Sequence, residues 1–247
     1  MTTTTTGRAG ARTDMAPAGG DGLAHLVPLL RRLAGDEKHE ASGHSTLDVI
    51  WVMYDRVLRV DPSRPDAPDR DRFLVSKGHG PHAFYAVLAA TGLIPVSWLD
   101  DLAGPDSRLG HHPDRTLVPG VEIASGSLGH GLGLAVGTAL GLRVRGQRSP
   151  DGPRVYVLLG DGELDEGANH EAIAYAGATG LDTLTAIVID NRSATHGWPG
   201  GIATRFTVNG WTAAGVDGRD HDAFEAAVRG HTPGHPHVVV AEVEGRS

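Results

Sequence analysis

The segment that decides the fold is "VYVLLGDGELDEGANHEA", residues 155–172. Its apolar start predicts a buried strand over residues 154–159, and the residues after the turn predict a helix over 164–179. Asp161 lies between Gly160 and Gly162, which allow a tight turn and let the backbone approach a ligand closely. The segment therefore predicts a strand–turn–helix unit that presents a carboxylate at the carboxyl end of its strand.

The remaining apolar segments alternate between the strand and helix patterns. Because the predicted strands are nearly continuous in apolar residues, they indicate a mostly parallel sheet with helices on both faces, an α/β fold. Residues 1–20 are rich in Thr, Gly and Ala and predict a disordered tail, and residues 21–247 predict a single domain. Further strands are expected over 71–76, 184–190 and 237–243, and further helices from about residue 22 and over 45–60, 76–92 and 129–142.

The composition excludes several classes of protein. The chain has no cysteine, so a metal would need oxygen or nitrogen ligands. A formal net charge of −8 argues against nucleic-acid binding, which usually needs a basic surface. The apolar segments are of strand length, and neither a membrane helix nor a secretory signal is recognisable. We therefore expect a cytoplasmic protein that binds small molecules.

Two polar residues at strand ends predict a metal site. Ligands of parallel sheets bind beyond the carboxyl ends of the strands, where both Asp161 and Asn191 are expected. The two residues are thirty positions apart (191 − 161 = 30), which is the length of one strand–helix–strand unit. A carboxylate, an amide oxygen and a nearby backbone carbonyl suit Mg²⁺, with phosphate oxygens completing the coordination. Amides at the N-terminus of the following helix would help to bind the phosphate.

Several longer segments together resemble a known family. The GDG turn followed by Asn191 resembles the thiamine-diphosphate-binding motif. The segments containing SKGH, HHPD, SGSLGHG and NGWTAAGVDGRDHDAF occur in the order found in the amino-terminal domain of transketolase. The resemblance covers roughly residues 25–245 and is greatest to the amino-terminal subunit of split, two-chain transketolases. It implies the thiamine diphosphate-binding fold, with thiamine diphosphate and Mg²⁺ (or Ca²⁺) as cofactors.

The resemblance also implies an activity and a set of site residues. The activity is transfer of a two-carbon ketol (or related acyl) unit from a ketose (phosphate) donor to an aldehyde or carbonyl acceptor, which makes the chain part of a transferase. The metal would be held by Asp161, Asn191 and the backbone of Ser193, and the cofactor by Gly126, Leu128, Gly160 and Gly162 as well as Asp161 and Asn191. The catalytic histidines would be His44, His79 and His112, while Glu166 matches a glutamate at a subunit contact. The roles of Lys77, His111, His130, His170 and His196 stay open.

The same resemblance predicts a partner. Thiamine chemistry needs a carboxylic acid beside the aminopyrimidine ring, and in the family this glutamate belongs to the next, pyrimidine-binding domain. The sequence ends at VAEVEGRS, before such a domain. We therefore expect a separate carboxyl-terminal subunit that carries the pyrimidine-binding domain, in an α2β2 assembly.

Two other functions remain open on the sequence alone. The alpha subunit of a 2-oxo-acid dehydrogenase shares the GDG motif and its asparagine, although SKGH and SGSLGHG favour transketolase. A non-catalytic module that binds only the cofactor or a partner is the third possibility, because the carboxyl-terminal part is short. The donor substrate, the acceptor and the pathway are not predicted.

Overall fold

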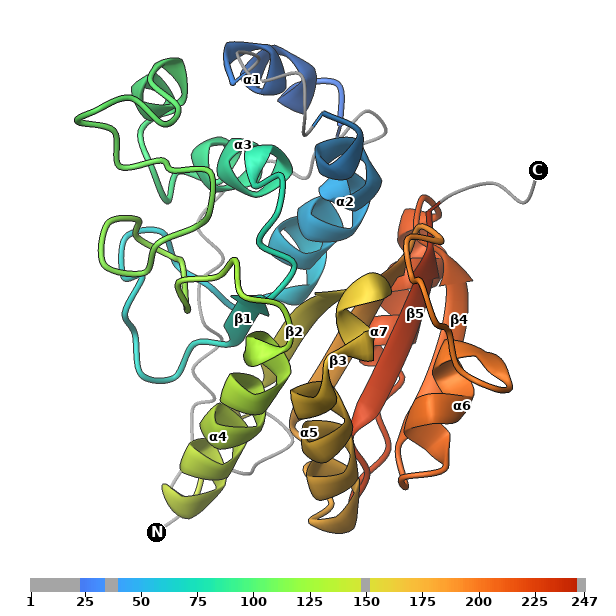
Figure 1. Cartoon of the computed structure of the whole chain (residues 1–247). Coiled ribbons are helices and arrows are strands. Elements are labelled where there is room, and N and C mark those ends of the chain that lie inside the picture. The colour runs from blue at the N-terminus through green and yellow to red at the C-terminus, as the bar shows by residue number, and fades with distance from the viewer. Residues whose placement is uncertain (1–22, 34–39, 148–151, 244–247) are drawn as a thin grey trace, which may run out of the picture.

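The computed structural model describes residues 23–33, 40–147 and 152–243, without the side chains of residues 40–45, so the tail predicted for residues 1–20 lies outside it. The described residues form a five-stranded sheet in the order β1-β2-β3-β5-β4, in which every neighbouring pair is parallel (Figure 1). The strands are β1 (Arg72–Val75), β2 (Val155–Gly160), β3 (Leu184–Asp190), β4 (Thr212–Asp217) and β5 (His237–Glu242). The predicted α/β class with a parallel sheet is confirmed.

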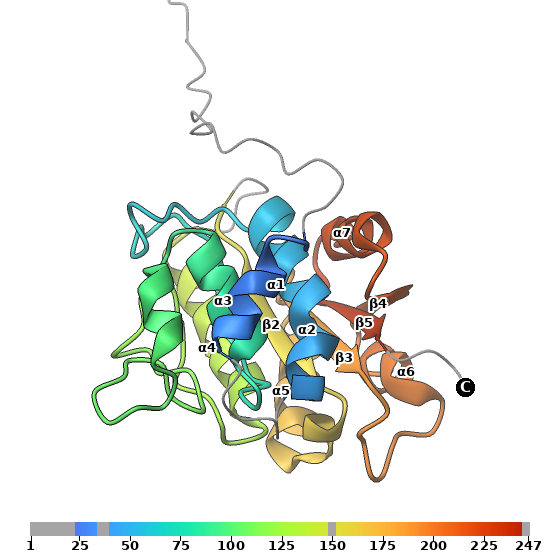
Figure 2. The same cartoon turned by 90° about the horizontal axis from the view of Figure 1, so that it is seen from above.

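Helices cover both faces of the sheet, and a hydrophobic cluster lies on each side (Figure 2). One face is covered by α1 (Leu26–Arg32), α2 (Glu40–Val52), α3 (His82–Ala90) and α7 (His221–Arg229). The other is covered by α4 (His130–Val144), α5 (Gly167–Ala178) and α6 (Gly201–Thr207). Short turns of other helix types are η2 (Met53–Val57), η3 (Val96–Asp100) and η4 (Gly162–Asp165).

The central strands are apolar on both sides because both sides are covered. All six residues of β2 are buried, and successive side chains alternate between the two clusters, with Val157 in one and Leu158 in the other. The strands β3 and β5 follow the same rule. Such burial on both faces explains why the predicted strands read as continuous apolar runs.

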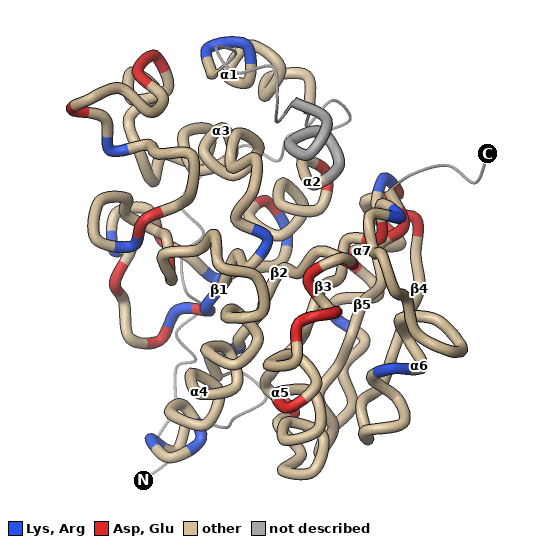
Figure 3. Tube along the Cα trace, in the orientation of Figure 1, with Lys and Arg blue, Asp and Glu red and all other residues tan. Residues whose placement is uncertain are grey.

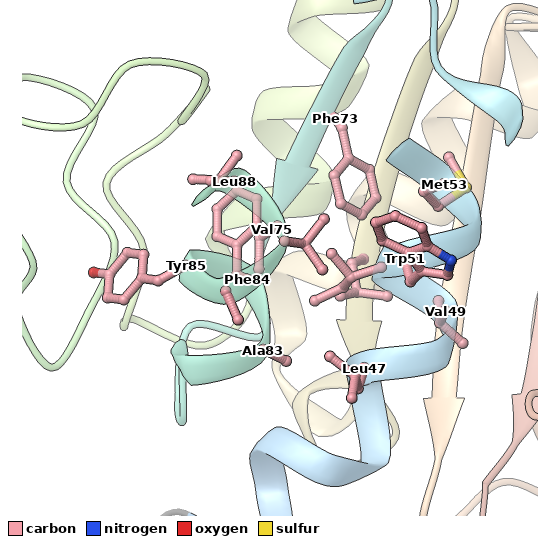
Figure 4. Packing of buried hydrophobic residues seen from close by; sticks show 14 of the residues in the cluster. Leu47, Val49, Trp51, Met53, Phe73, Val75, Ala83, Phe84, Tyr85 and Leu88 are labelled. Carbon is pink, nitrogen blue, oxygen red and sulfur yellow. The ribbon is translucent and has the colours of Figure 1, made fainter. Parts of the chain in front are cut away.

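Aromatic packing holds the end of β1 against the helices. Phe73 of β1 contacts Phe84 of α3 edge to face, with ring centroids 6.4 Å apart (Figure 4). Trp51 of α2 and Leu88 of α3 belong to the same cluster. The segment between β1 and α3, which contains SKGH, is therefore flanked on both sides by residues packed in the core.

Three elements were not predicted from the sequence, namely β4, α6 and α7. The strand β4 lies at the edge of the sheet and has the sequence TAAGVD, so small residues replace the long β-branched ones of the central strands. The helix predicted over 45–60 begins earlier, at Glu40, and its last part forms the π-helical turn η2. None of the helices in the described ranges has the length and hydrophobicity that crossing a bilayer requires.

Gly177 of α5 gives a prediction about stability. A Cβ atom added there would lie 1.7 Å from the carbonyl oxygen of Asn209, so Gly177→Ala forces the backbone of that loop to move. We expect it to lower the free energy of unfolding by about 3 kcal/mol, the upper range for an overpacked site. The matched control is Gly167→Ala in the same helix, which meets nothing within 4 Å and should be neutral or stabilising. Urea unfolding of both variants checks this, and equal stabilities would contradict the close contact.

Candidate functional site

The carboxylate of Asp161 lies at the tip of β2 and is almost completely buried, with 2 % of the residue exposed. It accepts hydrogen bonds from the backbone N–H groups of Gly162 at 2.8 Å, Ser193 at 2.7 Å and Ala194 at 3.2 Å. The Ser193 hydroxyl donates a fourth at 2.5 Å. These bonds join the turn after β2 to the loop after β3, so the two strand ends meet as the spacing predicted.

The loop after β3 carries the other two predicted metal ligands. The Oδ1 atom of Asn191 is buried and has no hydrogen-bond partner in the described part of the protein. The Ser193 carbonyl faces the turn after β2, since a Cβ atom added at Gly162 would lie 3.5 Å from its oxygen. Buried polar atoms normally have a partner, so an orphaned amide oxygen here needs an explanation.

The oxygen atoms of Asp161, Asn191 and Ser193 are suitable ligands for a hard divalent cation. One carboxylate, one amide oxygen and one backbone carbonyl are the oxygen ligands that Mg²⁺ prefers when phosphate oxygens supply the rest. A cation bound to the Asp161 carboxylate would replace at least one of the four hydrogen-bond donors that contact it. The Ser193 hydroxyl can rotate away without moving the backbone. Within the described ranges no group of three or more His, Asp or Glu side chains could hold a metal, so backbone or amide oxygens would have to take part in any site here.

Glu163 is a buried carboxylate that the sequence did not distinguish from its acidic neighbours. It accepts hydrogen bonds from the Ser76 hydroxyl, from the Gly129 N–H at 3.1 Å and from the Gly160 N–H at 3.3 Å. Burial raises the pKa of its carboxyl group, against the opposing effect of these bonds and of Lys77. Glu163 therefore ties the ends of β1 and β2 to the N-terminus of α4.

Lys77 of the SKGH segment lies beside the two carboxylates. Its stem passes over Gly160, where an added Cβ atom would lie 3.5 Å from Lys77 Cδ. Burial lowers the pKa of its ammonium group, while the negative charges of Asp161 and Glu163 oppose that shift. The site thus places a cationic side chain next to the turn that would receive the diphosphate, a position that the sequence alone did not assign to this lysine.

Two of the three predicted catalytic histidines lie side by side. The rings of His79 and His112 meet edge to face with centroids 5.1 Å apart, and both residues are exposed. His112 Nδ1 is 3.1 Å from the Gly78 carbonyl oxygen. A carbonyl only accepts, so Nδ1 donates to it, and in a neutral imidazole Nε2 is then the acceptor. The backbone of His44 lies in α2, and its side chain is outside the described part.

One of the residues predicted to contact the aminopyrimidine, Gly126, lies against the same histidine pair. Gly126 has a φ of 129°, and a Cβ atom there would lie 3.0 Å from the His112 ring, so the ring packs directly on this glycine. Leu128 is 39 % exposed, so the turn before α4 presents an apolar side chain to the outside of this chain. The SKGH, HHPD and SGSLG segments therefore converge, although they are far apart in sequence.

The remaining predicted residues occupy separate positions. Glu166 is the N-cap residue of α5, is exposed, and lies against Gly129, whose added Cβ would be 2.7 Å from Glu166 Cβ. His111 is exposed in the long loop, and His130 is the exposed first residue of α4. His170 lies near the start of α5, where it contacts Arg205, and the backbone of His196, in the loop after β3, bonds to Asp165.

Comparison with known proteins identifies the family. Residues 24–243 match the family model described as "Transketolase, thiamine diphosphate binding domain". The chain is 37 % identical over 210 residues to one subunit of the apulose-4-phosphate transketolase of Actinobacillus succinogenes, covering 82 % of this chain and 75 % of that one. The fold is similar to transketolase from Leishmania mexicana, with a TM-score of 0.71 and 25 % identity over 88 % of this chain.

A further relative bears a different name. The protein called ferredoxin fas2 of Rhodococcoides fascians is 52 % identical over 222 residues, covering 90 % of this chain and 72 % of that protein. Ferredoxin clusters are held by cysteine thiolates, and these 247 residues contain none. The matched region of this chain therefore lacks the ligands that such a cluster would need.

The family match includes the strand tips described above. It covers both the GDG turn and the loop after β3, together with the convergent SKGH, HHPD and SGSLG segments. The chain spans 36 % of the length of the Leishmania transketolase that it resembles. The chain belongs to the transketolase family and contains its thiamine diphosphate binding domain.

Proposed function

We propose that this chain is the amino-terminal subunit of a two-chain transketolase that uses thiamine diphosphate and Mg²⁺. The observation that carries the proposal is the buried, unpaired Oδ1 of Asn191 on the loop that hydrogen-bonds to Asp161. Asp161, Asn191 and the Ser193 carbonyl would hold the cation, with Ca²⁺ as a substitute. The backbone of Gly160 and Gly162 and the ammonium group of Lys77 would face the diphosphate.

When bound, thiamine diphosphate supplies a nucleophilic carbon that also stores the electrons released on cleavage of a donor. The contribution of this chain is to position the cofactor and to move protons at the donor and acceptor. His112 Nε2 is an acceptor that can take a proton from a substrate hydroxyl, and His79 packs against its ring. Gly126 and Leu128 would contact the aminopyrimidine through their backbones, and the family resemblance adds His44 to the proposed channel.

The substrates follow from the same proposal. A ketose (phosphate) would donate the two-carbon unit, and an aldehyde or other carbonyl compound would accept it. The relative from Actinobacillus succinogenes is named as one subunit of its transketolase, which supports a separate partner chain here. The partner would supply the pyrimidine-binding domain, and both chains would act in the cytoplasm, where phosphorylated sugars are retained.

An exposed face of α4 and α5 supports a second copy of this chain in the assembly. The two helices pack side by side. Several of their exposed residues are apolar or small, and His130, His170 and Glu171 are exposed as well. We call this the α4/α5 face and define it by Leu134, Gly137, Gly141, Ala174, Tyr175 and Ala178. Leu134 is 49 % exposed and Tyr175 is 50 % exposed, while added Cβ atoms at Gly137 and Gly141 meet nothing within 4 Å.

The charge distribution along α4 agrees with self-association through this face, while α5 contributes the exposed Glu171 one turn before Ala174 and Tyr175. Within α4 the one charged side chain is Arg143, in the last turn, and the rest of the helix is uncharged (Figure 3). A self-complementary apolar face is the usual basis of a two-fold symmetric dimer. Glu166, which the resemblance places at a subunit contact, lies at the N-terminus of α5 beside this face. Two copies of each subunit would give the α2β2 stoichiometry.

Mixing experiments test the proposed function. We expect the purified chain alone to be inactive, and a mixture with a subunit carrying the pyrimidine-binding domain to cleave a ketose phosphate when both thiamine diphosphate and Mg²⁺ are present. Coupled spectrophotometric detection of the released aldehyde measures this. Turnover by this chain alone would contradict the shared site. Decarboxylation of a 2-oxo acid with a lipoyl acceptor would indicate a dehydrogenase subunit, and cofactor binding without any turnover would indicate a non-catalytic module.

A further inference from the structure

A buried arginine connects the two segments that flank the proposed metal site. Arg205 of α6 is 3 % exposed. Its guanidinium donates to the Leu164 carbonyl, lies 2.5 Å from His170 Nε2 and lies 3.6 Å from Asp165 Oδ1. Burying a guanidinium is costly unless its N–H groups are paired, and the Nε atom of Arg205 is buried with no hydrogen-bond partner in the described part of the protein.

The partners of Arg205 belong to different parts of the chain. Leu164 and Asp165 end the turn η4, which begins directly after Asp161. Trp198 belongs to the loop after β3, and its ring centroid lies 5.0 Å from Arg205 Cζ. The same carboxylate of Asp165 accepts a hydrogen bond from the His196 N–H at 3.2 Å. Arg205 and Asp165 thus join the turn after β2 to the loop after β3 at a second place, beyond the bonds made by the Asp161 carboxylate itself.

His170 completes this cluster as a neutral acceptor. A guanidinium has only donors, so His170 Nε2 must accept and its proton lies on Nδ1. Burial, with the positive charge of Arg205 as the second cause, lowers the pKa of His170, in agreement with the neutral form. Its ring centroid lies 5.4 Å from that of Trp198, so the imidazole neighbours both the guanidinium and the indole.

We propose that Arg205, acting through Asp165 and the Leu164 carbonyl, is a positioning residue that sets the affinity of the site for its divalent cation. The inference rests on the metal site proposed above. Asn191 and Ser193 lie on a loop that contains two glycines with positive φ, Gly197 and Gly200, so this backbone has much freedom to lose. Holding the loop in place before binding removes that cost from the binding step, which raises the affinity.

The chain offers a matched control for this guanidinium. Arg143 of α4 also donates to two backbone carbonyls, those of Thr179 at 2.9 Å and Gly180 at 2.5 Å. These carbonyls follow the C-terminus of α5, whereas the Arg205 cluster lies at its N-terminus. Arg143→Lys therefore removes a comparable clamp from the other end of the same helix.

The test uses the full chain with its pyrimidine-domain partner and compares wild type, Arg205→Lys, Asp165→Asn and Arg143→Lys. Lysine keeps the charge and the stem but loses the planar fork. At fixed thiamine diphosphate, we expect Arg205→Lys and Asp165→Asn to raise the Mg²⁺ concentration for half-maximal cofactor binding by about 10- to 100-fold, as for other residues that orient metal ligands. Saturating Mg²⁺ should restore binding, and Arg143→Lys should behave as wild type.

Hydrogen exchange of the cofactor-free chain gives a second readout that does not involve turnover. Peptides covering residues 191–200 should exchange faster in Arg205→Lys, while peptides from β2 and β3 keep wild-type protection. A folded Arg205→Lys variant with the wild-type Mg²⁺ requirement and exchange would overturn the inference. An equal loss in Arg143→Lys would also overturn it, because the effect would then be general destabilisation. A wild-type pair that binds no cofactor with Mg²⁺ would overturn the proposed function itself.

Discussion

Replacing Asp161 with asparagine should abolish Mg²⁺-dependent binding of thiamine diphosphate to the assembled protein. Asparagine keeps the size of the side chain but removes its negative charge. Its amide NH₂ group would also face the backbone N–H groups that now donate hydrogen bonds to the carboxylate. The N–H groups of Gly162, Ser193 and Ala194 all point at this carboxylate. Asp161 is the one carboxylate among the proposed metal ligands, so we expect the cofactor Kd to rise by at least about 100-fold, which is the upper end for residues that only orient metal ligands.

Calorimetric titration of thiamine diphosphate at saturating Mg²⁺ measures this change. The control is Asp220→Asn, which removes the same charge from the N-cap of α7, where the carboxylate accepts from the Ala223 N–H at 3.0 Å. It should leave the Kd unchanged. Urea unfolding without cofactor shows whether the Asp161 variant is folded, and a folded variant with wild-type affinity would refute the metal assignment.

Replacing Leu134 with aspartate should separate the two copies of this chain. Leu134 belongs to the α4/α5 face and is half exposed in the single chain. In a symmetric dimer each copy would bury one new carboxylate against apolar and small residues, without a cationic partner on α4 before its last turn. An unpaired buried charge costs about 3 to 5 kcal/mol, so the dissociation constant should rise by at least about 100-fold.

Sedimentation equilibrium of the chain with its partner detects this as a fall of the assembly mass to half. Tyr175→Asp tests the same face from α5 and should act in the same direction. The matched control is Val208→Asp after α6, because Val208 is 67 % exposed and lies outside the face. If both Leu134→Asp and Tyr175→Asp retain the full mass, this face does not join the two copies.

The apolar runs of the central strands were sufficient to predict the α/β class. Residues 154–159 and 184–190 were both assigned from pattern, and they form the adjacent parallel strands β2 and β3. The strand β4 was missed because an edge strand buries less and can use Ala and Gly, as TAAGVD does. The helix predicted over 164–179 is divided at Glu166 into η4 and α5, a break that periodicity does not reveal.

Part of the site could be predicted for the same reason. The thirty-residue separation of Asp161 and Asn191 implied that both follow neighbouring strands, and the bonds between Asp161 and Ser193 show that the two strand ends meet. The family resemblance placed His79 and His112 in one channel, and their rings are in contact. The roles of these residues toward metal, cofactor and substrate are part of the proposal.

Other features depend on contacts that no local pattern contains. Glu163 and Asp165 have the same charge and stand two positions apart, yet Glu163 is buried against Ser76 and Gly129 while Asp165 faces Arg205 and His196. In the sequence, Arg205 does not differ from any other helical arginine, and its role depends on α6 packing it against η4.

The sequence by itself determined the parallel sheet, the family and the position of the carboxylate at a strand end, because hydrophobic periodicity and the length of a strand–helix–strand unit are local properties. Only the tertiary structure decided which carboxylates are buried, which arginine holds the two loops together and which helix faces stay open to another chain. These depend on which distant segments the sheet brings together, and side chains of one type have the same appearance in a sequence whether they face solvent or a buried partner.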